Sequence, residues 1–256
     1  MKAIIVGVCG RMGRELVRVA EQGEIIIVGG VDTAYNGQSY PFPVVTGYDQ
    51  LSESADVLID FSHPGSLAKL LPYCLEKHLP CILCATGYTD EHVRRVEEAS
   101  CKIPILRSAN MSIGIHVMEQ LISIAAKALG ADYDVEIVEK HHRMKLDSPS
   151  GTAIQLYKAI QGSLANEKDP VFGRHGHMDR REKGAIGIHS VRGGTQTGEH
   201  EVGFYGEGEQ LVLTHRAENR ALFAQGAIRA ARFLAGKPAG LYTMLDVATE
   251  MVGGWS

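Results

Sequence analysis

Short apolar runs alternate with helical patterns through the first half of the chain. One apolar run ends at Gly7, and the later runs and the helical stretches between them cover residues 25–31, 57–61, 65–77, 81–85, 90–100 and 103–106. Buried strands separated by helices are what a parallel sheet with helices on both faces requires. The pattern predicts an α/β fold with a Rossmann-type doubly wound parallel sheet.

The pattern changes in the second half. Residues 113–129 have the spacing of a long helix, and residues 134–138 alternate polar and apolar side chains as a half-buried strand does. Three further strand-like runs follow one another through glycine-rich turns, at residues 186–191, 201–205 and 210–215. Consecutive strands with short connections predict an α+β domain with a mixed or antiparallel sheet.

A last helical pattern covers residues 220–235 and has the length to pack on the first sheet. We therefore expect the C-terminal part to return to the first domain. The expected division is a dinucleotide-binding domain of residues 1–112 with 219–256, and a substrate-binding and oligomerisation domain of residues 113–218.

Three glycines follow the first strand and open a helical pattern. Gly7, Gly10 and Gly13 have G-x-x-G-x-x-G spacing, and the next apolar run ends at Asp32. A strand, a glycine loop and a helix, followed by an acidic residue about 20 positions on, are typical of dinucleotide binding. The helix start would hold the pyrophosphate and the carboxylate would bind the ribose hydroxyls. A tight turn between a packed strand and helix is the alternative.

The residues after Asp32 bear on the choice of dinucleotide. A carboxylate repels a 2′-phosphate, and Thr33-Ala34-Tyr35 supplies no arginine to attract one. The sequence therefore favours NADH over NADPH, with Arg11 of the glycine loop as a cation that would weaken the preference.

Small and polar residues follow the later strands of the first half. Ligands of open α/β sheets bind beyond the carboxyl ends of the strands, so we expect these loops to flank the nicotinamide. Thr86 and Asn110 are candidate contacts to the amide or ribose. Turn chemistry alone is an equal alternative for each.

The densest chemistry lies in residues 139–153, which read EKHHRMKLDSPSGTA. Ser150 is a good N-cap for a helix over residues 152–161, and the unpaired N–H groups of a helix start form an anion cradle. Lys145 and one of the two histidines would bring positive charge and proton transfer to the same anion. The segment predicts a catalytic loop for a small carboxylate or phosphate that also needs a proton.

Two adjacent histidines in a basic loop also fit a solvated surface or half of a metal site. A zinc site would need further ligands, and no thiol lies nearby. We interpret the later run Arg174-His175-Gly176-His177 as a surface or lid loop. The combination of histidine, lysine and helix start favours catalysis, and we expect no metal.

Composition and charge narrow the class of protein. The chain has 256 residues, enough for one large domain or two smaller ones, and its 29 glycines favour a loop-rich α/β enzyme. A formal net charge of −4 without a long basic run argues against nucleic acid as the main partner. The chain has no secretory leader pattern and no apolar run of membrane-spanning length, so we expect a cytoplasmic protein with no membrane partner.

The cysteines are expected to be free thiols. Their number is odd and they lie scattered in apolar segments, at Cys9, Cys74, Cys81, Cys84 and Cys101. Cys81 and Cys84 form a C-x-x-C pattern within a predicted strand. Because strand residues three apart point to opposite faces, we expect neither a redox pair nor a metal site there.

Four segments resemble motifs of the dihydrodipicolinate reductase family, also called 4-hydroxy-tetrahydrodipicolinate reductases. Residues 6–14, VGVCGRMGR, resemble its glycine-loop signature, and residues 139–153 resemble its motif E-x-H-H-x-x-K-x-D-[AS]-P-S-G-T-A. Residues 198–200 and 214–217 lie where the family has G-E-H and T-H-[KR]-A. The resemblance covers nearly the whole chain.

The resemblance implies an enzyme that reduces 4-hydroxy-tetrahydrodipicolinate (dihydrodipicolinate), a cyclic dicarboxylate, with NADH or NADPH in the diaminopimelate route to lysine. It also implies a homotetramer built through the sheet of the substrate domain. His141 would donate or accept the proton, Lys145 would be the other general acid, and His142 would contact the substrate. Ser150, Gly151 and Thr152 would bind a substrate carboxylate. The implied cofactor site consists of Gly7, Val8, Cys9, Gly10, Arg11, Met12, Asp32, Cys84, Ala85, Thr86, Ser108, Ala109, Asn110 and Met111.

The chain departs from the family pattern at the expected cofactor site. Cys84-Ala85-Thr86-Gly87 replaces a frequent G-T-T-G, His63 and Thr33 stand where Arg is common, and Met111 replaces a common Phe. The catalytic loop keeps the full pattern. The departures therefore bear on the choice of cofactor more than on the type of reaction.

Three other functions fit parts of the sequence. A two-domain dehydrogenase of a semialdehyde would share the architecture, and a nucleotide-sensing regulator would bind the dinucleotide without turnover. A zinc hydrolase would use His141, His142 and the loop at residues 174–177. The intact His-Lys-Ser-Gly-Thr loop argues against the sensor.

Overall fold

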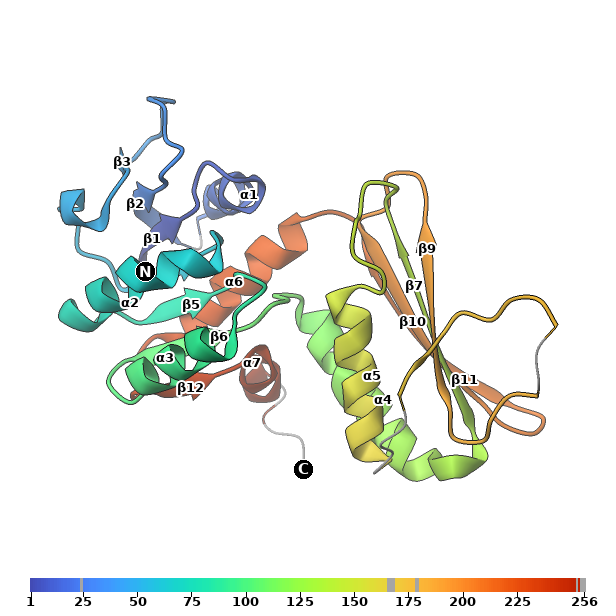
Figure 1. Cartoon of the computed structure of the whole chain (residues 1–256). Coiled ribbons are helices and arrows are strands. Elements are labelled where there is room, and N and C mark those ends of the chain that lie inside the picture. The colour runs from blue at the N-terminus through green and yellow to red at the C-terminus, as the bar shows by residue number, and fades with distance from the viewer. Residues whose placement is uncertain (24, 165–168, 178–179, 252, 254–256) are drawn as a thin grey trace. The chain divides into compact units, whose positions relative to one another are not determined.

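The computed structural model describes residues 1–23, 25–164, 169–177, 180–251 and 253 (Figure 1). The chain forms two compact units. Unit 1 consists of Met1–Ile113 and Arg220–Ser256, and unit 2 consists of Gly114–Asn219. The predicted fold class, a doubly wound parallel sheet together with a second, mixed sheet, is confirmed.

Unit 1 is built on seven parallel strands in the order β12-β6-β5-β4-β1-β2-β3. The strands are β1 (Lys2–Val6), β2 (Ile26–Val31), β3 (Val44–Val45), β4 (Val57–Asp60), β5 (Cys81–Leu83), β6 (Pro104–Arg107) and β12 (Gly240–Tyr242). Because β1 lies between β2 and β4, the chain order reverses there. Open α/β sheets bind ligands beyond the carboxyl ends of the strands at such a point.

Helices cover both faces of this sheet. They are α1 (Arg11–Ala20), α2 (Leu67–Glu76), α3 (Asp90–Ser100), α6 (Ala221–Leu234) and α7 (Met244–Met251), with short 3-10 helices η1 (Tyr48–Gln50) and η2 (Pro64–Ser66). Alternate residues of β1 face different cores. Ala3 and Ile5 pack with α1, α6 and α7, and Ile4 and Val6 pack with α2 and α3.

Cys81 and Cys84 belong to opposite cores, as the strand alternation predicts. The five cysteines are free. In the part of the chain that the structure describes, no helix is long and apolar enough to cross a membrane.

Unit 2 contains a mixed five-stranded sheet in the order β11-β10-β7-β9-β8. The strands are β7 (Asp134–His141), β8 (Val171–Phe172), β9 (Ile186–Arg192), β10 (Gly198–Tyr205) and β11 (Gln210–Ala217). Strand β10 is antiparallel to β7 and β11, whereas β9 is parallel to β7 and β8. Two long helices, α4 (Ile113–Leu129) and α5 (Gly151–Ser163), share a core with the sheet, and the short η3 (Gly130–Asp132) follows α4.

The two faces of β7 differ in character. Val135 and Ile137 enter the core with α4 and α5, and Glu139 and His141 continue the same buried face beyond it. The other face leaves apolar side chains exposed on the neighbouring strands, among them Val191, Tyr205 and Val212. Tyr205 folds over Gly203, where an added Cβ would lie 2.5 Å from the tyrosine oxygen.

Strand β7 is longer than predicted. The alternating pattern predicts a strand over residues 134–138, but the strand continues to His141. Glu139 and His141 are therefore strand residues with directions fixed by the pleat, and not loop residues. The prediction stopped short because it used hydrophobicity alone. Glu139 and His141 are polar, so their positions did not count as part of a buried strand face.

Candidate active site

The glycine loop of unit 1 is closely packed. Gly7 has a positive φ of 77°, and an added Cβ there would lie 2.9 Å from the Phe61 carbonyl oxygen. A Cβ on Gly13 would lie 2.3 Å from the Gly7 carbonyl oxygen, so α1 approaches the loop at a distance that only glycine allows. Gly10 is the N-cap of α1 and has no side chain to occupy the free N–H groups of the first turn.

Asp32 ties the end of β2 to this loop. Its Oδ2 accepts from the Cys9 N–H at 2.9 Å, and its Oδ1 accepts from the Ala34 N–H at 2.9 Å. Each carboxylate oxygen has a second lone pair, so the group can still accept hydrogen bonds from a ribose.

A cavity of about 500 Å³ in unit 1 joins these features. Gly7, Gly10 and Asp32 line it, and so do Thr33, Ala34 and residues after β4 that include His63 and Lys69. The volume is in the range of small-molecule sites. A tight glycine turn, an uncapped helix start and an acceptor carboxylate around one cavity fit the phosphates and ribose of a dinucleotide.

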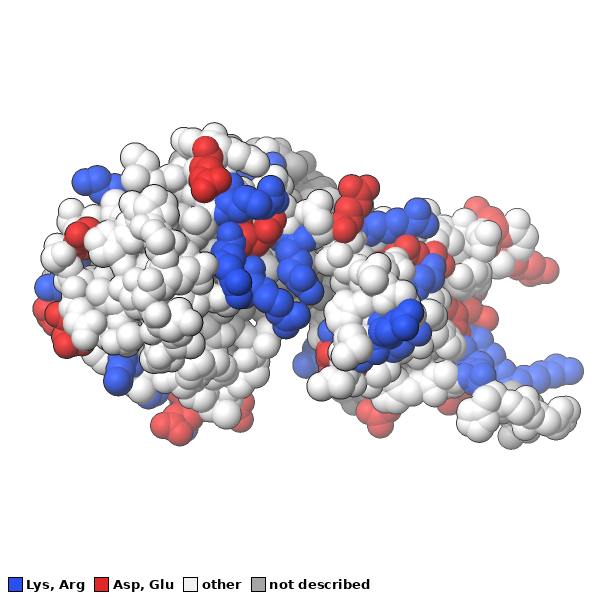
Figure 2. All heavy atoms as spheres, turned by 90° about the horizontal axis from the view of Figure 1, so that it is seen from above, with Lys and Arg blue, Asp and Glu red and all other residues white. Residues whose placement is uncertain are grey.

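Basic side chains lie close to the same loop in the sequence. Helix α1 exposes Arg11, Arg14 and Arg18, of which Arg18 pairs with Glu15 at 2.6 Å. Figure 2 shows several Lys and Arg side chains close together on the surface that it draws. Positive charge is thus local on a chain whose net charge is −4.

The remaining predicted cofactor residues lie at the carboxyl ends of β5 and β6 or within the glycine loop. Cys84, Ala85 and Met111 are buried, Ser108 donates to the Asn110 carbonyl oxygen at 2.6 Å, and the Asn110 side chain accepts from the Ser112 N–H at 2.9 Å. They share the carboxyl-end edge of the sheet but do not line the 500 Å³ cavity, and neither do Val8, Cys9, Arg11, Met12, Thr86 and Ala109.

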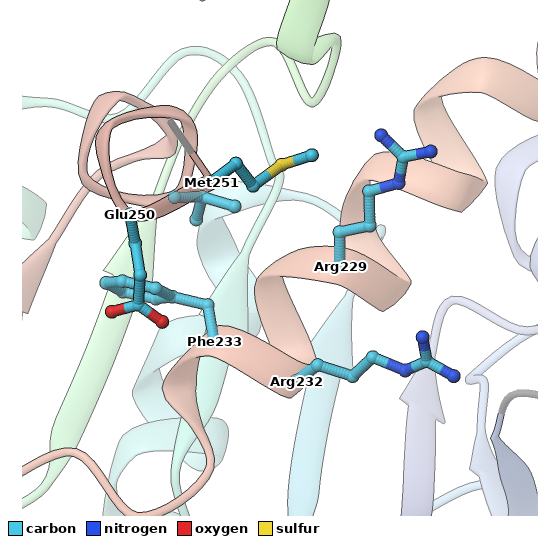
Figure 3. A pocket seen from close by; sticks show the side chains of 6 residues that line it. Arg229, Arg232, Phe233, Glu250 and Met251 are labelled. Atoms are coloured by element: carbon cyan, nitrogen blue, oxygen red, sulfur yellow. The ribbon is translucent and has the colours of Figure 1, made fainter. Parts of the chain in front are cut away.

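A second cavity of about 440 Å³ lies between α6 and α7, as Figure 3 shows. It is lined by Arg229, Arg232, Phe233, Val247, Glu250 and Met251. Lys237 pairs with Glu250 and lies over the Phe233 ring at 4.3 Å. None of the residues expected to act on a ligand lies in this cavity.

The most highly connected polar side chain of the predicted site in unit 2 is Glu139, which is fully buried. Its Oε2 lies 2.6 Å from His141 Nδ1, and Arg192 donates to both carboxylate oxygens, at 2.7 and 2.6 Å. The Ser150 N–H also donates to it, at 3.2 Å. Four hydrogen bonds from three residues thus converge on one carboxylate.

Helix α5 begins at the same point. Ser150 is the N-cap, as predicted, and its hydroxyl oxygen accepts from the Ala153 N–H at 3.1 Å. The same hydroxyl lies 2.9 Å from Nε2 of the buried His200, whose ring meets the His141 ring edge-on at 5.2 Å. Nothing lies within 4 Å of a Cβ built on Gly151, so this helix start is accessible to a ligand.

Lys145 lies on the loop between β7 and α5. Its Nζ pairs with Asp147 Oδ2 at 2.9 Å, and Arg192 donates to the Asp147 carbonyl oxygen at 2.7 Å. The His142 N–H donates to the Gln196 carbonyl oxygen at 2.9 Å, which joins the loop to the segment before β10. The loop is therefore held by β9 and by the segment between β9 and β10.

The pKa values of Glu139, His141 and His200 are all lowered, for different physical reasons. Burial acts to raise the pKa of Glu139, but hydrogen bonds from Arg192, Ser190 and His141 outweigh it and lower the pKa to about 2. Burial lowers the pKa of His141, and the hydrogen bond to Glu139 offsets part of this. Burial, together with the charge of His141, lowers the pKa of His200 to about 3, so His200 is neutral at ordinary pH.

The structure brings together the unit 2 residues that the sequence singles out, but it adds partners that the sequence does not indicate. Ser190 and Arg192 reach Glu139 because β9 pairs in parallel with β7, with Glu139 beside Ser190 and His141 beside Arg192. His200 and Gly198 come from β10. The G-E-H motif at residues 198–200 was the only sequence signal for any of them.

Family models and individual relatives indicate the same family for this chain. Residues 1–111 match the family model of the dihydrodipicolinate reductase N-terminus, and residues 114–248 match that of the C-terminus. The 4-hydroxy-tetrahydrodipicolinate reductase of Clostridium tetani is 44% identical over 245 residues, which is 95% of each chain. The protein of the same name from Caldanaerobacter subterraneus subsp. tengcongensis is 43% identical over 251 residues, 98% of this chain and 99% of that one.

A solved structure shares the architecture. Dipicolinate-bound dihydrodipicolinate reductase from Paenisporosarcina sp. TG-14 superposes with a TM-score of 0.79 at 26% identity, covering 95% of this chain and 97% of that one.

Proposed function

The chain belongs to the dihydrodipicolinate reductase family, and on that premise we propose how its residues reduce 4-hydroxy-tetrahydrodipicolinate to tetrahydrodipicolinate, with the 4-hydroxyl group leaving as water. It is an NAD(P)H-dependent oxidoreductase of diaminopimelate and lysine biosynthesis. The observation that carries the proposal is the buried His141–Glu139–Arg192 group beside the open start of α5.

Unit 1 is the dinucleotide-binding domain in this proposal. The α1 start at Gly10 holds the pyrophosphate, and Asp32 accepts hydrogen bonds from the adenosine ribose. The loops after β5 and β6, residues 84–86 and 108–111, flank the nicotinamide. When bound, the reduced dinucleotide supplies the hydride.

Unit 2 binds the dicarboxylate. The N–H groups of Gly151 and Thr152, with the Ser150 turn, hold one carboxylate at the positive end of α5. Lys145 adds a positive charge, and His142 contacts the ring of the substrate. Two fixed anchors on one ring limit its orientation, which is the contribution of proximity to the rate.

His141 supplies the proton. A carboxylate can only accept, so Nδ1 of His141 donates to Glu139, and Nε2 is the atom that exchanges a proton with the substrate carbon. Lys145 acts as the other general acid. The neutral His200 adds no competing positive charge beside them.

We also propose that the enzyme favours NADH. Asp32 faces the ribose position, and neither Thr33 nor Ala34 offers a guanidinium to a 2′-phosphate. Lys69 lines the same cavity and is a second cation, besides Arg11, that would allow NADPH to bind as well.

A homotetramer in the cytoplasm completes the proposal. The sheet of unit 2 exposes apolar side chains on the face that α4 and α5 leave uncovered, and a second copy of the sheet would bury them.

The test supplies the purified protein with freshly made product of the preceding aldolase step and follows NADH and NADPH absorbance in separate reactions. We expect both to be consumed, with the higher kcat/KM for NADH. Binding of dinucleotide without loss of absorbance would support a sensor instead. Hydrolysis that a chelator abolishes, without loss of dinucleotide absorbance, would support a zinc hydrolase.

A further inference from the structure

We propose that Glu139 is the positioning residue of this site: its carboxylate fixes the orientation of the His141 ring and joins that ring to the first turn of α5. The inference rests on the proposed function, because it gives His141 a role in proton transfer. It adds a residue that contacts neither substrate nor cofactor and that acts through its neighbours.

Strand geometry sets up the interaction. Glu139 and His141 are two residues apart on β7, so their side chains point to the same face. The short 2.6 Å contact between Oε2 and Nδ1 follows from this spacing. Because the carboxylate has no proton to give, it selects the tautomer with hydrogen on Nδ1 and leaves Nε2 for the reaction.

The far side of the ring is fixed by shape. A Cβ built on Gly198 of β10 would lie 2.9 Å from His141 Nε2 and 3.3 Å from Cδ2. Real Cβ atoms essentially never approach so closely, so the ring occupies the space that a side chain at position 198 would fill. Glu139 holds one edge of the imidazole, and the absence of a side chain on Gly198 gives room to the other.

The same carboxylate reaches the anion-binding helix. Oε1 accepts from the Ser150 N–H, and the Ser150 hydroxyl accepts from the Ala153 N–H. Having accepted there, the hydroxyl has its own hydrogen to donate to Nε2 of the neutral His200. The buried Glu139 carboxylate therefore contacts both the proposed proton donor and the start of the helix that is proposed to bind the substrate carboxylate.

Arg192 keeps this group ionised. A buried carboxylate without a partner would be strongly destabilising, and the two hydrogen bonds from one guanidinium are the geometry that offsets the loss of water. Arg192 also holds the Asp147 carbonyl on the loop that carries Lys145. The charged or titratable groups around His141 are Glu139, Arg192, Lys145 and His200.

The decisive variant is Glu139→Gln, which keeps the shape and removes the charge. In it His141 keeps burial and the cations Lys145 and Arg192 but loses the anion, so its pKa falls further. If imidazolium is the donor, activity is lost as pH rises through that pKa. We expect kcat to drop by ~10²-fold, the loss that follows a displacement of about 1 Å, and the alkaline limb of its pH profile to move to lower pH.

A second measurement does not use turnover. In ¹⁵N-histidine-labelled free protein, NMR at a pH above the His141 pKa should show hydrogen on Nδ1 in the wild type and a tautomer mixture in Glu139→Gln, with His141→Gln identifying the signal. A wild-type tautomer and an unmoved pH limb in Glu139→Gln would overturn the inference even if the protein is the proposed reductase. If the wild type shows hydrogen on Nδ1 of His141 but has no reductase activity, the proposed function is rejected and the positioning role of Glu139 is not.

Two control variants accompany Glu139→Gln. Glu199→Gln removes another buried carboxylate, which pairs with Lys140 at 2.6 Å and Arg216 at 2.8 Å, and it should leave the tautomer and the pH limb unchanged. Gly198→Ala keeps every charge but crowds the ring, so we expect kcat to fall by ~10²-fold without a shift of the limb. Full activity of Gly198→Ala would contradict the steric part of the inference, and this variant remains informative if Glu139→Gln does not fold.

Discussion

His141 acquires its properties from its position on a strand. Burial on the inner face of β7 disfavours the charged ring and lowers its pKa, and the neighbouring carboxylate partly restores the charged form. A histidine on an exposed loop would have neither effect. The ring is therefore held in one orientation and remains able to gain and lose a proton.

Replacement of either proposed acid should slow the reaction. We expect His141→Gln and Lys145→Ala each to lower kcat by at least ~10²-fold, since a positioned acid typically contributes that much. Steady-state kinetics with freshly made substrate measures it. Arg143→Ala is the control, because it removes an exposed cation two residues from Lys145 and should retain nearly full kcat. Near-wild-type turnover of either proposed acid variant would remove that residue from the mechanism.

Lys69 should affect the two dinucleotides differently. It lines the cavity that also contains Asp32, so Lys69→Met should raise the Kd of NADPH ~3-fold and leave that of NADH almost unchanged, as expected for one exposed charge. Calorimetric titration of each dinucleotide measures this. Lys77 directly follows the same helix, lies outside the cavity and pairs with Glu76. The control variant Lys77→Met should therefore change neither Kd. An equal loss for both dinucleotides would show that Lys69 does not sense the 2′-phosphate.

The stability of helix α5 depends on its N-cap residue, Ser150. Ser150 caps it, and Ser150→Ala removes that hydrogen bond and leaves buried His200 Nε2 without its hydroxyl partner. A lost N-cap costs ~1 kcal/mol, which lowers Tm by ~2–4 °C in a protein of this size. Calorimetry compares it with Ser163→Ala, at the other end of α5, where the hydroxyl donates to the Ala159 carbonyl oxygen of the same helix. Equal Tm values for the two variants would contradict the role of the cap.

The long helices and the strands within continuous apolar runs could be predicted from the sequence, and the other short elements could not. The periodic stretches expected at residues 90–100 and 113–129 are α3 and α4 with the same bounds. Strands β3 and β8 have two residues each and β12 has three, too few for a period to appear, and α7 has only eight. A two-residue alternation carries no information that distinguishes a strand from a turn.

The candidate site shows a different limit. Residues 139–153 are contiguous, so their chemistry could be recognised locally. Arg192 is 53 positions away from Glu139, and only the register of β7 with β9 brings them together. No local pattern encodes that register, because it depends on which strands pair in the folded sheet.

Stability of the whole protein should fall in acid in two stages. A neutral buried His200 with a pKa of about 3 charges only in the unfolded chain as pH falls below about 6.5. Glu139, with a pKa of about 2, adds a second loss as pH falls below its ordinary value of 4.5. Each group contributes at most ~1.4 kcal/mol per pH unit. Calorimetry from pH 8 to about 2.5 should show Tm constant and then falling in two stages, and His200→Asn should flatten the first stage. An unchanged slope in His200→Asn would contradict this assignment.

The open face of the unit 2 sheet should govern assembly. Val212 is exposed on β11, and a sheet face with exposed apolar side chains is a usual surface for association of identical subunits. Val212→Lys places a charge there, which would be buried without a partner in the proposed homotetramer. We therefore expect sedimentation to show a tetramer for the wild type and smaller species for the variant. Leu241→Lys is the control, because Leu241 is a comparably exposed apolar residue on β12 of unit 1 and should leave the assembly intact. A tetramer that persists in Val212→Lys but dissociates in Leu241→Lys would move the interface from unit 2 to unit 1.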